Sequence, residues 1–311
     1  VRCTPMTTED PDEGQCSVML GLGVPVAKRF NETWHELVSE MFENCSEFIT
    51  TSKSAYDIYT RIYPQLKEKP FHIIEHGRDL KIPDNIEITT DIENDDPIRI
   101  VVPGNISISK GADYVYDLKK CDKDNKIELH FMGDVYGEYD FEKVGVVHGR
   151  YKRSEFNDIV HSINPHFIGI FSIWPETYCH TLTEAWSSGV PVLCQDLGAP
   201  GERIRAHGGG YLISSDPKEA YEQIISFKDK PAEYEEIMKS IEDITIKSTR
   251  QMADEYLRIY NSNMKNVLYL QNSNDLKLSS EVGKLSSNSY VLTSDENSIK
   301  LYMYDEIEPD Y

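Results

Sequence analysis

Short apolar runs alternate with helical patterns through the middle of the chain. Continuous apolar runs predict strands, and apolar residues that recur every three or four positions predict helices. The expected strands are "IRIVVPG" (98–104), "KIELHFMG" (126–133), "VGVVHG" (144–149), "HFIGIF" (166–171), "PVLC" (191–194) and "GYLI" (210–213). The expected helices between them are 109–121, 152–162, 179–189 and 200–207. This order is typical of βα units, so the pattern predicts an α/β domain with a parallel sheet covered by helices on both faces.

A shorter patterned segment precedes this domain. Helical spacing predicts a helix over residues 30–42, and "EFITTS" (47–52) predicts a strand. Ser52 is a candidate N-cap for a helix over 52–63. "FHIIEHG" (71–77) predicts a second strand. The segment therefore adds two helices and two strands ahead of the alternating region.

Changes in composition indicate the boundaries. Residues 79–97 are polar, acidic and bounded by proline, which is typical of a linker. Two amphipathic helices are expected over 216–228 and 245–268. The residues that follow are rich in Ser and Asn, which favours a tail or linker. The predicted parts are 1–80, a linker at 81–97, the α/β domain at 98–268 and a polar tail or linker at 269–311.

Charge and cysteine usage exclude several functional classes. The formal net charge is −21, so nucleic acid is not expected as a partner, because a polyanion would be repelled. No apolar run approaches the ~20 residues that span a bilayer. The six cysteines include no C-x-x-C pair, which argues against a zinc site and suits a reducing cytoplasm. Because the chain starts at Val1, we expect a piece of a larger multidomain protein, cytoplasmic and peripheral to a membrane only through that parent.

The loop "PGNISISKG" (103–111) has the composition of a phosphate-binding loop. In open parallel sheets, ligands bind beyond the carboxyl ends of the strands, where this loop is expected. Its glycines permit close backbone approach, and Lys110 supplies a positive charge. The alternative is an ordinary strand-to-helix turn with a solvated lysine.

A second loop, "PETYCHTLTEAW" (175–186), carries two glutamates eight positions apart. The amides of His180 and Thr181 are expected at the start of a helix, where unpaired N–H groups favour a diphosphate. If the interval is helical, Glu176 and Glu184 are separated by a rise of ~12 Å. The carboxylates of a glycosidase stand roughly 5–10 Å apart. The spacing therefore favours the two ends of a nucleotide-sugar over one scissile bond, although each glutamate alone is also compatible with a solvated position.

A third loop, "HGRYKRSEF" (148–156), joins a strand to a helix. Backbone groups near Arg150 and Tyr151 are candidates for contact with a nucleobase. The alternative for Arg150 is a solvated surface turn.

These motifs together resemble those of retaining GT-B glycosyltransferases of the family 4 type. The family's usual E-G-F-G-x-x-x-x-E-A motif, followed by GvPV, aligns without a gap with "ETYCHTLTEAWSSGVPV". "PGNISISKGADYV" is similar to its G-R-x-x-x-x-K-G loop, and "IELHFMGD" to the strand that ends at Gly133. The resemblance extends from residue 98 to about 262, and "FITTSKSAYDIYTRIYP" with "FHIIEHGRD" resembles the end of the N-terminal lobe. It implies a Rossmann-like sheet with a truncated N-terminal lobe.

The resemblance also implies an activity and assigns roles. It implies a metal-independent hexosyltransferase without a cofactor, which moves a sugar from a nucleoside-diphosphate-sugar to a glycan or lipid-linked acceptor in cell-surface polysaccharide or glycoconjugate synthesis. Glu176 would lie at the transferred sugar as the catalytic residue. Donor binding would involve Gly104, Asn105, Lys110, Gly133, Arg150, Tyr151, His180, Thr181, Leu182 and Glu184, with Glu184 at the ribose.

Two departures from the family pattern affect these expectations. Asn105 occupies the position of the family's arginine, which removes one cation from the diphosphate site. Most of the N-terminal lobe, which normally supplies the acceptor site and a catalytic histidine, is absent. We therefore expect the chain by itself to bind donor weakly and to transfer little.

Parts of the sequence are compatible with three other functions. The G-x-G in "VMLGLGVPVA" (18–27) suggests a dehydrogenase, but it lacks a second strand that ends in an acid. A nucleotide-sugar epimerase shares the two-lobed fold. A non-catalytic nucleotide-sugar-binding module of a multidomain protein is favoured by Asn105 and the reduced N-terminal lobe. The nucleotide, the sugar, the acceptor, the oligomeric state and the role of residues 270–311 stay open.

Overall fold

The computed structural model describes residues 24–84, 86, 90–135, 139–263, 267–270, 289–295 and 298–304. The chain forms two compact units, Val1–Thr249 and Arg250–Tyr311.

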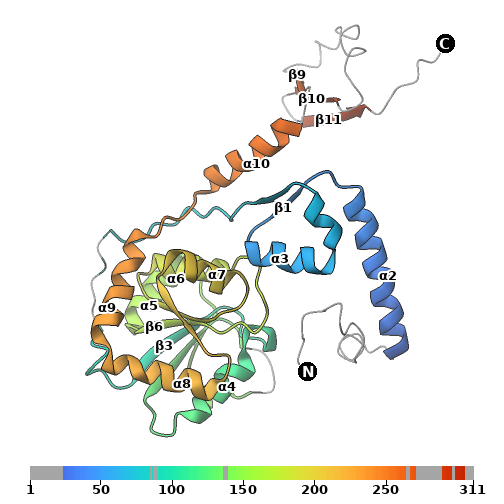
Figure 1. Ribbon diagram of the computed structural model, residues 1–311. Helices are drawn as coiled ribbons and strands as arrows, with labels where there is room; N and C mark the ends of the chain where they lie inside the picture. Colours follow the sequence, from blue (N-terminus) through green and yellow to red (C-terminus); the bar gives the residue numbers. More distant parts are fainter. Residues whose placement is uncertain are drawn as a thin grey trace, which may run out of the picture. The chain divides into compact units, whose positions relative to one another are not determined.

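The first unit is built on a six-stranded parallel sheet, which confirms the predicted fold class (Figure 1). Its order is β5-β4-β3-β6-β7-β8. The strands are β3 (Ile98–Pro103), β4 (Ile127–Met132), β5 (Val146–Gly149), β6 (Phe167–Ile170), β7 (Val192–Gln195) and β8 (Gly210–Ile213). The strand order reverses between β3 and β6, and such a switch point is where ligands bind in open α/β sheets.

Helices cover both faces of this sheet, as the alternating pattern predicted. They are α4 (Ala112–Cys121), α5 (Phe156–Ile163), α6 (His180–Ser187), α7 (Gly198–His207) and α8 (Pro217–Ser226), with short 3-10 turns η2 (Ile108–Lys110), η3 (Phe141–Lys143) and η4 (Arg153–Glu155). Figure 1 shows α4 and α8 on one side of β3 and β6, and α5, α6 and α7 on the other.

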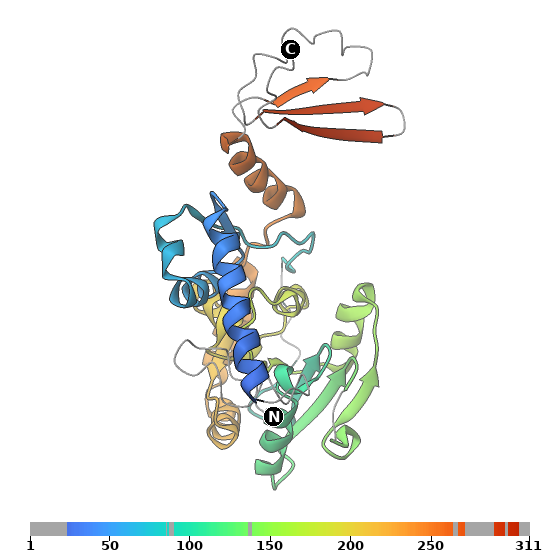
Figure 2. The same cartoon turned by 90° about the vertical axis from the view of Figure 1, so that its right-hand side faces the viewer.

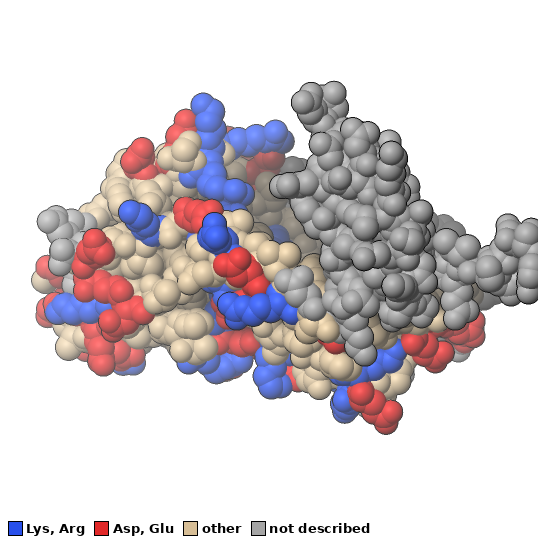
Figure 3. Space-filling model, turned by 90° about the horizontal axis from the view of Figure 1, so that it is seen from above, with Lys and Arg blue, Asp and Glu red and all other residues tan. Residues whose placement is uncertain are grey.

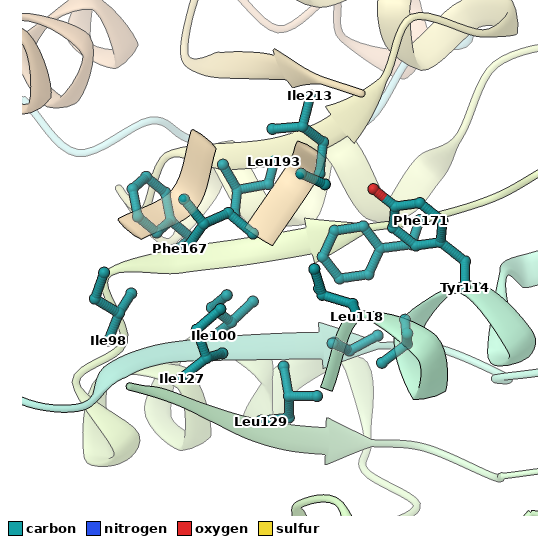
Figure 4. Close-up of a cluster of buried hydrophobic side chains, with 14 of the residues drawn as sticks. Ile98, Ile100, Tyr114, Leu118, Ile127, Leu129, Phe167, Phe171, Leu193 and Ile213 are labelled. Atoms are coloured by element: carbon teal, nitrogen blue, oxygen red, sulfur yellow. The ribbon is translucent and has the colours of Figure 1, made fainter. Parts of the chain in front are cut away.

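Two hydrophobic clusters form because successive strand residues point to opposite faces. Ile98 and Ile100 of β3 pack in the cluster that also contains Leu118 of α4 (Figure 4). Val101, which follows Ile100 and points to the opposite face, packs in the other cluster with Trp186 of α6. All five side chains are almost fully buried, so β3 lies in the middle of the domain and holds its carboxyl end firmly in place.

One helix was not predicted. The sequence favoured helices over 216–228 and 245–268, but the structure has α8, then η5 (Phe227–Asp229), α9 (Pro231–Ser240), η6 (Ile241–Asp243) and α10 (Thr249–Asn263). Tyr234 and Met238 of α9 are buried four positions apart, which is the helical spacing. Pro231 occupies the first turn, where its missing N–H costs nothing.

The segment ahead of the domain contains the predicted elements. They are α2 (Val24–Glu43), β1 (Phe48–Thr50), α3 (Lys53–Ile62), η1 (Pro64–Glu68) and β2 (Phe71–Ile73), with β1 parallel to β2. Ser52 is the N-cap of α3, as predicted, and its hydroxyl accepts a hydrogen bond from the Ala55 amide. Phe42 of α2 packs with Tyr63 and Leu66.

Helix α3 is attached to α7 of the domain at its N-terminus. The Glu202 carboxylate accepts hydrogen bonds from the Lys53 amide (2.9 Å) and from the amide and hydroxyl of Ser54 (2.7 Å each). Nearby, the Thr51 hydroxyl donates to the carbonyl of Thr177 at 2.7 Å. The segment ahead of the domain therefore contacts the loop that carries Glu176.

The second unit contains strands where the sequence favoured a polar tail or linker. They are β9 (Val267–Leu270), β10 (Ser289–Asp295) and β11 (Ser298–Tyr304), in the order β11-β10-β9 (Figure 2). β10 pairs antiparallel with β11 and parallel with β9. Apolar residues alternate with polar ones in "SIKLYMY", and the high Ser and Asn content around it outweighed that pattern. The four-part division of the chain stays a prediction.

Candidate functional site

The ends of β3 and β4 approach each other closely at the carboxyl edge of the sheet. Gly104 and Gly133 follow these strands with φ of +101° and +130°. A Cβ atom on Gly133 would come within 2.2 Å of the Gly104 carbonyl oxygen. The Gly104 amide donates to the Met132 carbonyl at 2.7 Å. The positive φ favours glycine at both positions, and at Gly133 the close contact also excludes a side chain. The two glycines form the floor of the site.

A cavity of about 530 Å³ lies on this floor. Eight residues from the ends of three strands, from η4 and from α6 line it: Gly104, Asn105, Gly133, Asp134, Arg150, Tyr151, Arg153 and Glu184. We call it the larger cavity. Five of the predicted donor-binding residues besides Glu184 are thus brought together here. Burial raises the pKa of Tyr151 to about 12, with a further contribution from the nearby Glu184 charge, so its phenol is neutral at physiological pH.

Glu184 is held by two arginines at the edge of the larger cavity. Its Oε1 lies 2.6 Å from a terminal nitrogen of Arg78 and 3.1 Å from Nε of Arg153. The side chains of Glu184 and Arg78 are 10% and 13% exposed, whereas that of Arg153 is 68% exposed. Arg78 therefore makes the buried ion pair and Arg153 the solvated one.

Arg150 forms a two-pronged ion pair across the same cavity. Its Nε lies 2.8 Å from both carboxylate oxygens of Asp134. A terminal guanidinium nitrogen also lies 2.8 Å from Asp134 Oδ2. The guanidinium is thereby anchored on the loop after β4. This differs from the alternative of a purely solvated turn.

A smaller cavity of about 80 Å³ adjoins the larger one, because Gly104 and Asn105 line both. Lys110, Glu176, Cys179 and Thr181 line its other side. Lys110 Nζ lies 2.7 Å from Glu176 Oε1. The two predicted glutamates consequently face adjoining cavities.

The loop before α6 is held in an unusual conformation. Cys179 has φ of +70°, a backbone conformation that residues other than glycine rarely adopt. Arg203 is buried and donates to the carbonyls of Tyr178 (3.3 Å) and Cys179 (3.0 Å). The Glu176 carbonyl accepts from the Ala199 amide at 2.8 Å. The start of α7 thus fixes the backbone on which Glu176 stands.

Helix α6 begins at His180, so only the second half of the interval between Glu176 and Glu184 is helical. The expected helical rise across the whole interval is therefore wrong, because the strained turn at Cys179 intervenes. Thr181 lines the smaller cavity. Leu182 has a buried side chain in the core.

The imidazole of His180 is exposed and packs against two rings. Its ring centroid lies 5.3 Å from that of Tyr178 and 5.1 Å from that of His76. Partial burial, followed by the positive charge of Arg78, lowers the pKa of His180 below its ordinary value. His180 is therefore a neutral side chain at physiological pH.

Basic groups slightly outnumber acidic groups around the two cavities. Four cations stand against three carboxylates, an excess of one positive charge in a chain of formal charge −21. They are Arg78, Lys110, Arg150 and Arg153, and Asp134, Glu176 and Glu184. On the face shown in Figure 3, Lys and Arg are interspersed with Asp and Glu. The site therefore suits a small anion more than the rest of the surface does.

The sequence matches the family described as "Glycosyl transferases group 1" over residues 85–243, more than half of the chain. The chain belongs to this family. The comparison with curated proteins gives no match.

Solved GT-B structures share the fold of this group 1 glycosyltransferase domain. HepE (Alr3699) from Anabaena, solved with UDP and glucose, has a TM-score of 0.59 and 15% identity over 76% of this chain and 68% of its own. Sucrose-phosphate synthase from Thermosynechococcus elongatus has a TM-score of 0.57 and 16% identity, over 74% of this chain and 61% of its own. A glycosyltransferase from Rickettsia africae has a TM-score of 0.54 and 15% identity, over 75% of this chain and 68% of its own. The chain thus spans about two thirds of the length of these proteins.

Four residues of the site were not singled out from the sequence. Arg78, Asp134 and Arg203 lie in segments that the family resemblance covers, but no role was assigned to their side chains. Arg153 belongs to "GRYKR" (149–153), whose cluster of positive charge was the available signal. The partners of Arg78 and Arg203 lie about 20 to 100 positions away, so only the folded chain reveals them.

No helix in the part of the chain that the structure describes is long and apolar enough to cross a membrane. Among the same residues, no group of three or more His, Cys, Asp or Glu side chains is arranged to hold a metal ion. Metal independence and cytoplasmic location stay predictions.

Proposed function

We propose that this chain is the donor-binding part of a retaining, family 4-type hexosyltransferase. It would move a sugar from a nucleoside-diphosphate-sugar to a glycan or lipid-linked acceptor, in cell-surface polysaccharide or glycoconjugate synthesis. The proposal rests above all on the adjoining cavities: Glu184 lines one, Glu176 lines the other, and Gly104 and Asn105 lie between them. Such a layout suits a ligand with two different ends and a charged middle.

The nucleoside would occupy the larger cavity. At about 530 Å³ it has room for a base and a ribose. Arg150 and Tyr151 would contact the base, and the buried Glu184 would accept hydrogen bonds from the ribose hydroxyls. A carboxylate accepts only, so hydroxyls are its natural partners here.

The diphosphate would bind between the cavities and the sugar near Glu176. Lys110 and the amides of His180 and Thr181 would contact the phosphate oxygens at the start of α6. These donors would stabilise the negative charge that grows on the departing diphosphate, which is where preorganised groups contribute most to catalysis. Glu176 would be the catalytic residue at the transferred ring. No metal or cofactor enters this scheme.

A non-catalytic nucleotide-sugar-binding module is the second candidate. Asn105 favours it, because this residue lines both cavities where the family's pattern has a cation. A module would bind donor without turning it over.

Turnover and stereochemistry separate the two candidates. The protein is incubated with UDP-, GDP-, ADP- and dTDP-sugars and acceptor glycans, and proton NMR follows the anomeric signals. The enzyme proposal predicts a product with the donor's anomeric configuration and its loss in Glu176→Gln. Inverted product contradicts the retaining assignment. Donor binding without turnover in the wild type favours the module, and sugar inversion without an acceptor favours an epimerase.

A further inference from the structure

Arg78 reaches the site from a segment outside the α/β domain's strands and helices. This segment is fixed against the residues that lead into α10: the Arg78 amide donates to the Lys247 carbonyl at 2.7 Å. The adjacent Asp79 carboxylate accepts from the Thr249 amide (3.0 Å) and hydroxyl (2.7 Å). A Cβ on Gly77 would lie 2.3 Å from the Ser248 carbonyl oxygen. The backbone of Arg78 is therefore held from both sides.

The Arg78 side chain forms its ion pair with one carboxylate oxygen of Glu184. Its terminal nitrogen donates to Oε1 at 2.6 Å, and Arg153 Nε lies 3.1 Å from the same oxygen. No hydrogen bond from the described residues reaches Glu184 Oε2. With Oε1 occupied, the carboxylate has one oxygen available to a ligand in the larger cavity.

We propose that Arg78 is a positioning residue: by holding Oε1 of Glu184 it leaves Oε2 to accept from the ribose 2′- or 3′-hydroxyl, and so makes the site selective for ribonucleotides. The inference rests on the proposed function of this cavity. A carboxylate held in one orientation loses little conformational freedom when it binds a hydroxyl. A site built to bind a hydroxyl then rejects the analogue that lacks it.

The two arginines have unequal roles in this scheme. Arg78 is 13% exposed, and its contact with Glu184 is shielded from water. Arg153 is 68% exposed, and solvent screens its contact with the same oxygen. Loss of Arg78 therefore releases the orientation of Glu184, whereas loss of Arg153 removes mainly a solvated charge.

The test compares ribose with 2′-deoxyribose in the same nucleotide. Titration calorimetry measures UDP, ADP and GDP, each with its 2′-deoxy counterpart, against wild type, Arg78→Ala, Arg78→Lys and Arg153→Ala. We expect the wild type to prefer one ribonucleotide by about 10- to 100-fold, the range of a hydrogen bond to a charged group. In Arg78→Ala the preference falls to within about threefold, while affinity for the 2′-deoxy form changes little.

Further variants separate positioning from a general loss of structure. Arg78→Lys keeps the charge and should restore part of the preference, and Arg153→Ala should keep most of it. Arg205→Ala removes an exposed arginine of α7 that pairs with Asp196, and it is the matched control outside both cavities. Melting temperatures show which variants fold, and if Arg78→Ala does not fold, Arg78→Lys carries the test with a reduced preference expected.

The outcomes distinguish this inference from the proposed function. An unchanged ribose preference in the folded Arg78 variants overturns the positioning role while leaving nucleotide binding intact. A wild type that binds a ribonucleotide and its 2′-deoxy form equally also overturns it. If the wild type binds none of the three nucleoside diphosphates, the proposed function itself fails.

Discussion

Lys110 Nζ lies 2.7 Å from Glu176 Oε1 and so joins the loops that follow β3 and β6. These strands are neighbours at the point where the strand order of the sheet reverses. In the free protein the two charges neutralise each other. A diphosphate would have to compete with Glu176 for Lys110. This competition determines whether replacing either residue raises or lowers the affinity for a nucleoside diphosphate.

Replacement of the acid should strengthen nucleotide binding while it abolishes turnover. In Glu176→Gln, Lys110 no longer has an anionic partner, and a negative charge near the phosphates is removed. We expect affinity for the sugar-free nucleoside diphosphate to rise about 3- to 10-fold, as for a partly solvated charge contact. Sugar transfer should fall at least ~100-fold. Calorimetry and a transfer assay measure the two effects, and a fall in nucleotide affinity would argue against the competition.

Replacement of the lysine should weaken diphosphate binding. A charge-assisted hydrogen bond is lost in Lys110→Ala, so affinity should fall about 10- to 100-fold. The salt dependence of binding should fall as well, because one cation no longer contacts phosphate. Calorimetry at two salt concentrations measures both. Lys120→Ala is the matched control, since this exposed lysine of α4 pairs with Asp117. Equal effects of the two substitutions would contradict the role of Lys110.

The contact between α3 and α7 should contribute to stability. Glu202→Ala removes an acceptor from the Lys53 amide and from the amide and hydroxyl of Ser54. Loss of this cap should lower the free energy of unfolding by about 1 to 2 kcal/mol. Urea unfolding measures the change. Glu222→Ala on α8, whose carboxylate is largely exposed, should change it by less than about 0.5 kcal/mol. Unaltered stability of Glu202→Ala would show that the contact is not made in solution.

The free energy of unfolding should decrease as the pH is lowered below the ordinary pKa of histidine, near 6.5. Burial, and then the charge of Arg99, lowers the pKa of His166 to about 4, while Asp95 opposes the shift and Lys228 adds to it. Between about pH 6.5 and 4, His166 therefore binds a proton in the unfolded chain but stays neutral in the folded chain. The contribution of neutral His166 to the free energy of unfolding is complete above this pH interval. It decreases as the pH falls through the interval, by about 3 kcal/mol at most.

Urea unfolding at pH 7 and pH 5 measures this loss. The His166 ring accepts a hydrogen bond from the Arg99 amide at 3.0 Å, so His166→Gln keeps an acceptor without the titrating group. The variant should lose less stability than the wild type between the two pH values. An equal loss in both proteins would show that other groups carry the pH dependence.

Local patterning was sufficient to predict the sheet. The strands from β3 to β8 carry short apolar runs or alternating apolar positions, and Ser52 has the residue type and position of a helix cap. The helix α9 was missed because its two buried residues are separated by acidic ones in a polar segment. β10 and β11 were missed because composition was weighted above alternation.

The site was predicted in outline and not in its contacts. The glycines and Lys110 are local features of a loop, so sequence spacing could identify them. The ion pair of Arg78 with Glu184 spans 106 positions, and only tertiary packing brings its partners together. Likewise, the buried Arg203 hydrogen-bonds the carbonyl of Cys179, the residue with positive φ, and no spacing rule reveals this contact. Long-range electrostatic partners are therefore what the sequence leaves undetermined.

The most direct test is a crystal structure of the chain with the nucleoside-diphosphate-sugar that raises its melting temperature most. We predict that Glu184 contacts the ribose and that Lys110 and the start of α6 contact the diphosphate. Glu176 should lie at the sugar in the smaller cavity. A nucleotide bound in the opposite direction or outside these cavities would contradict the account, as would the absence of any stabilising nucleotide-sugar.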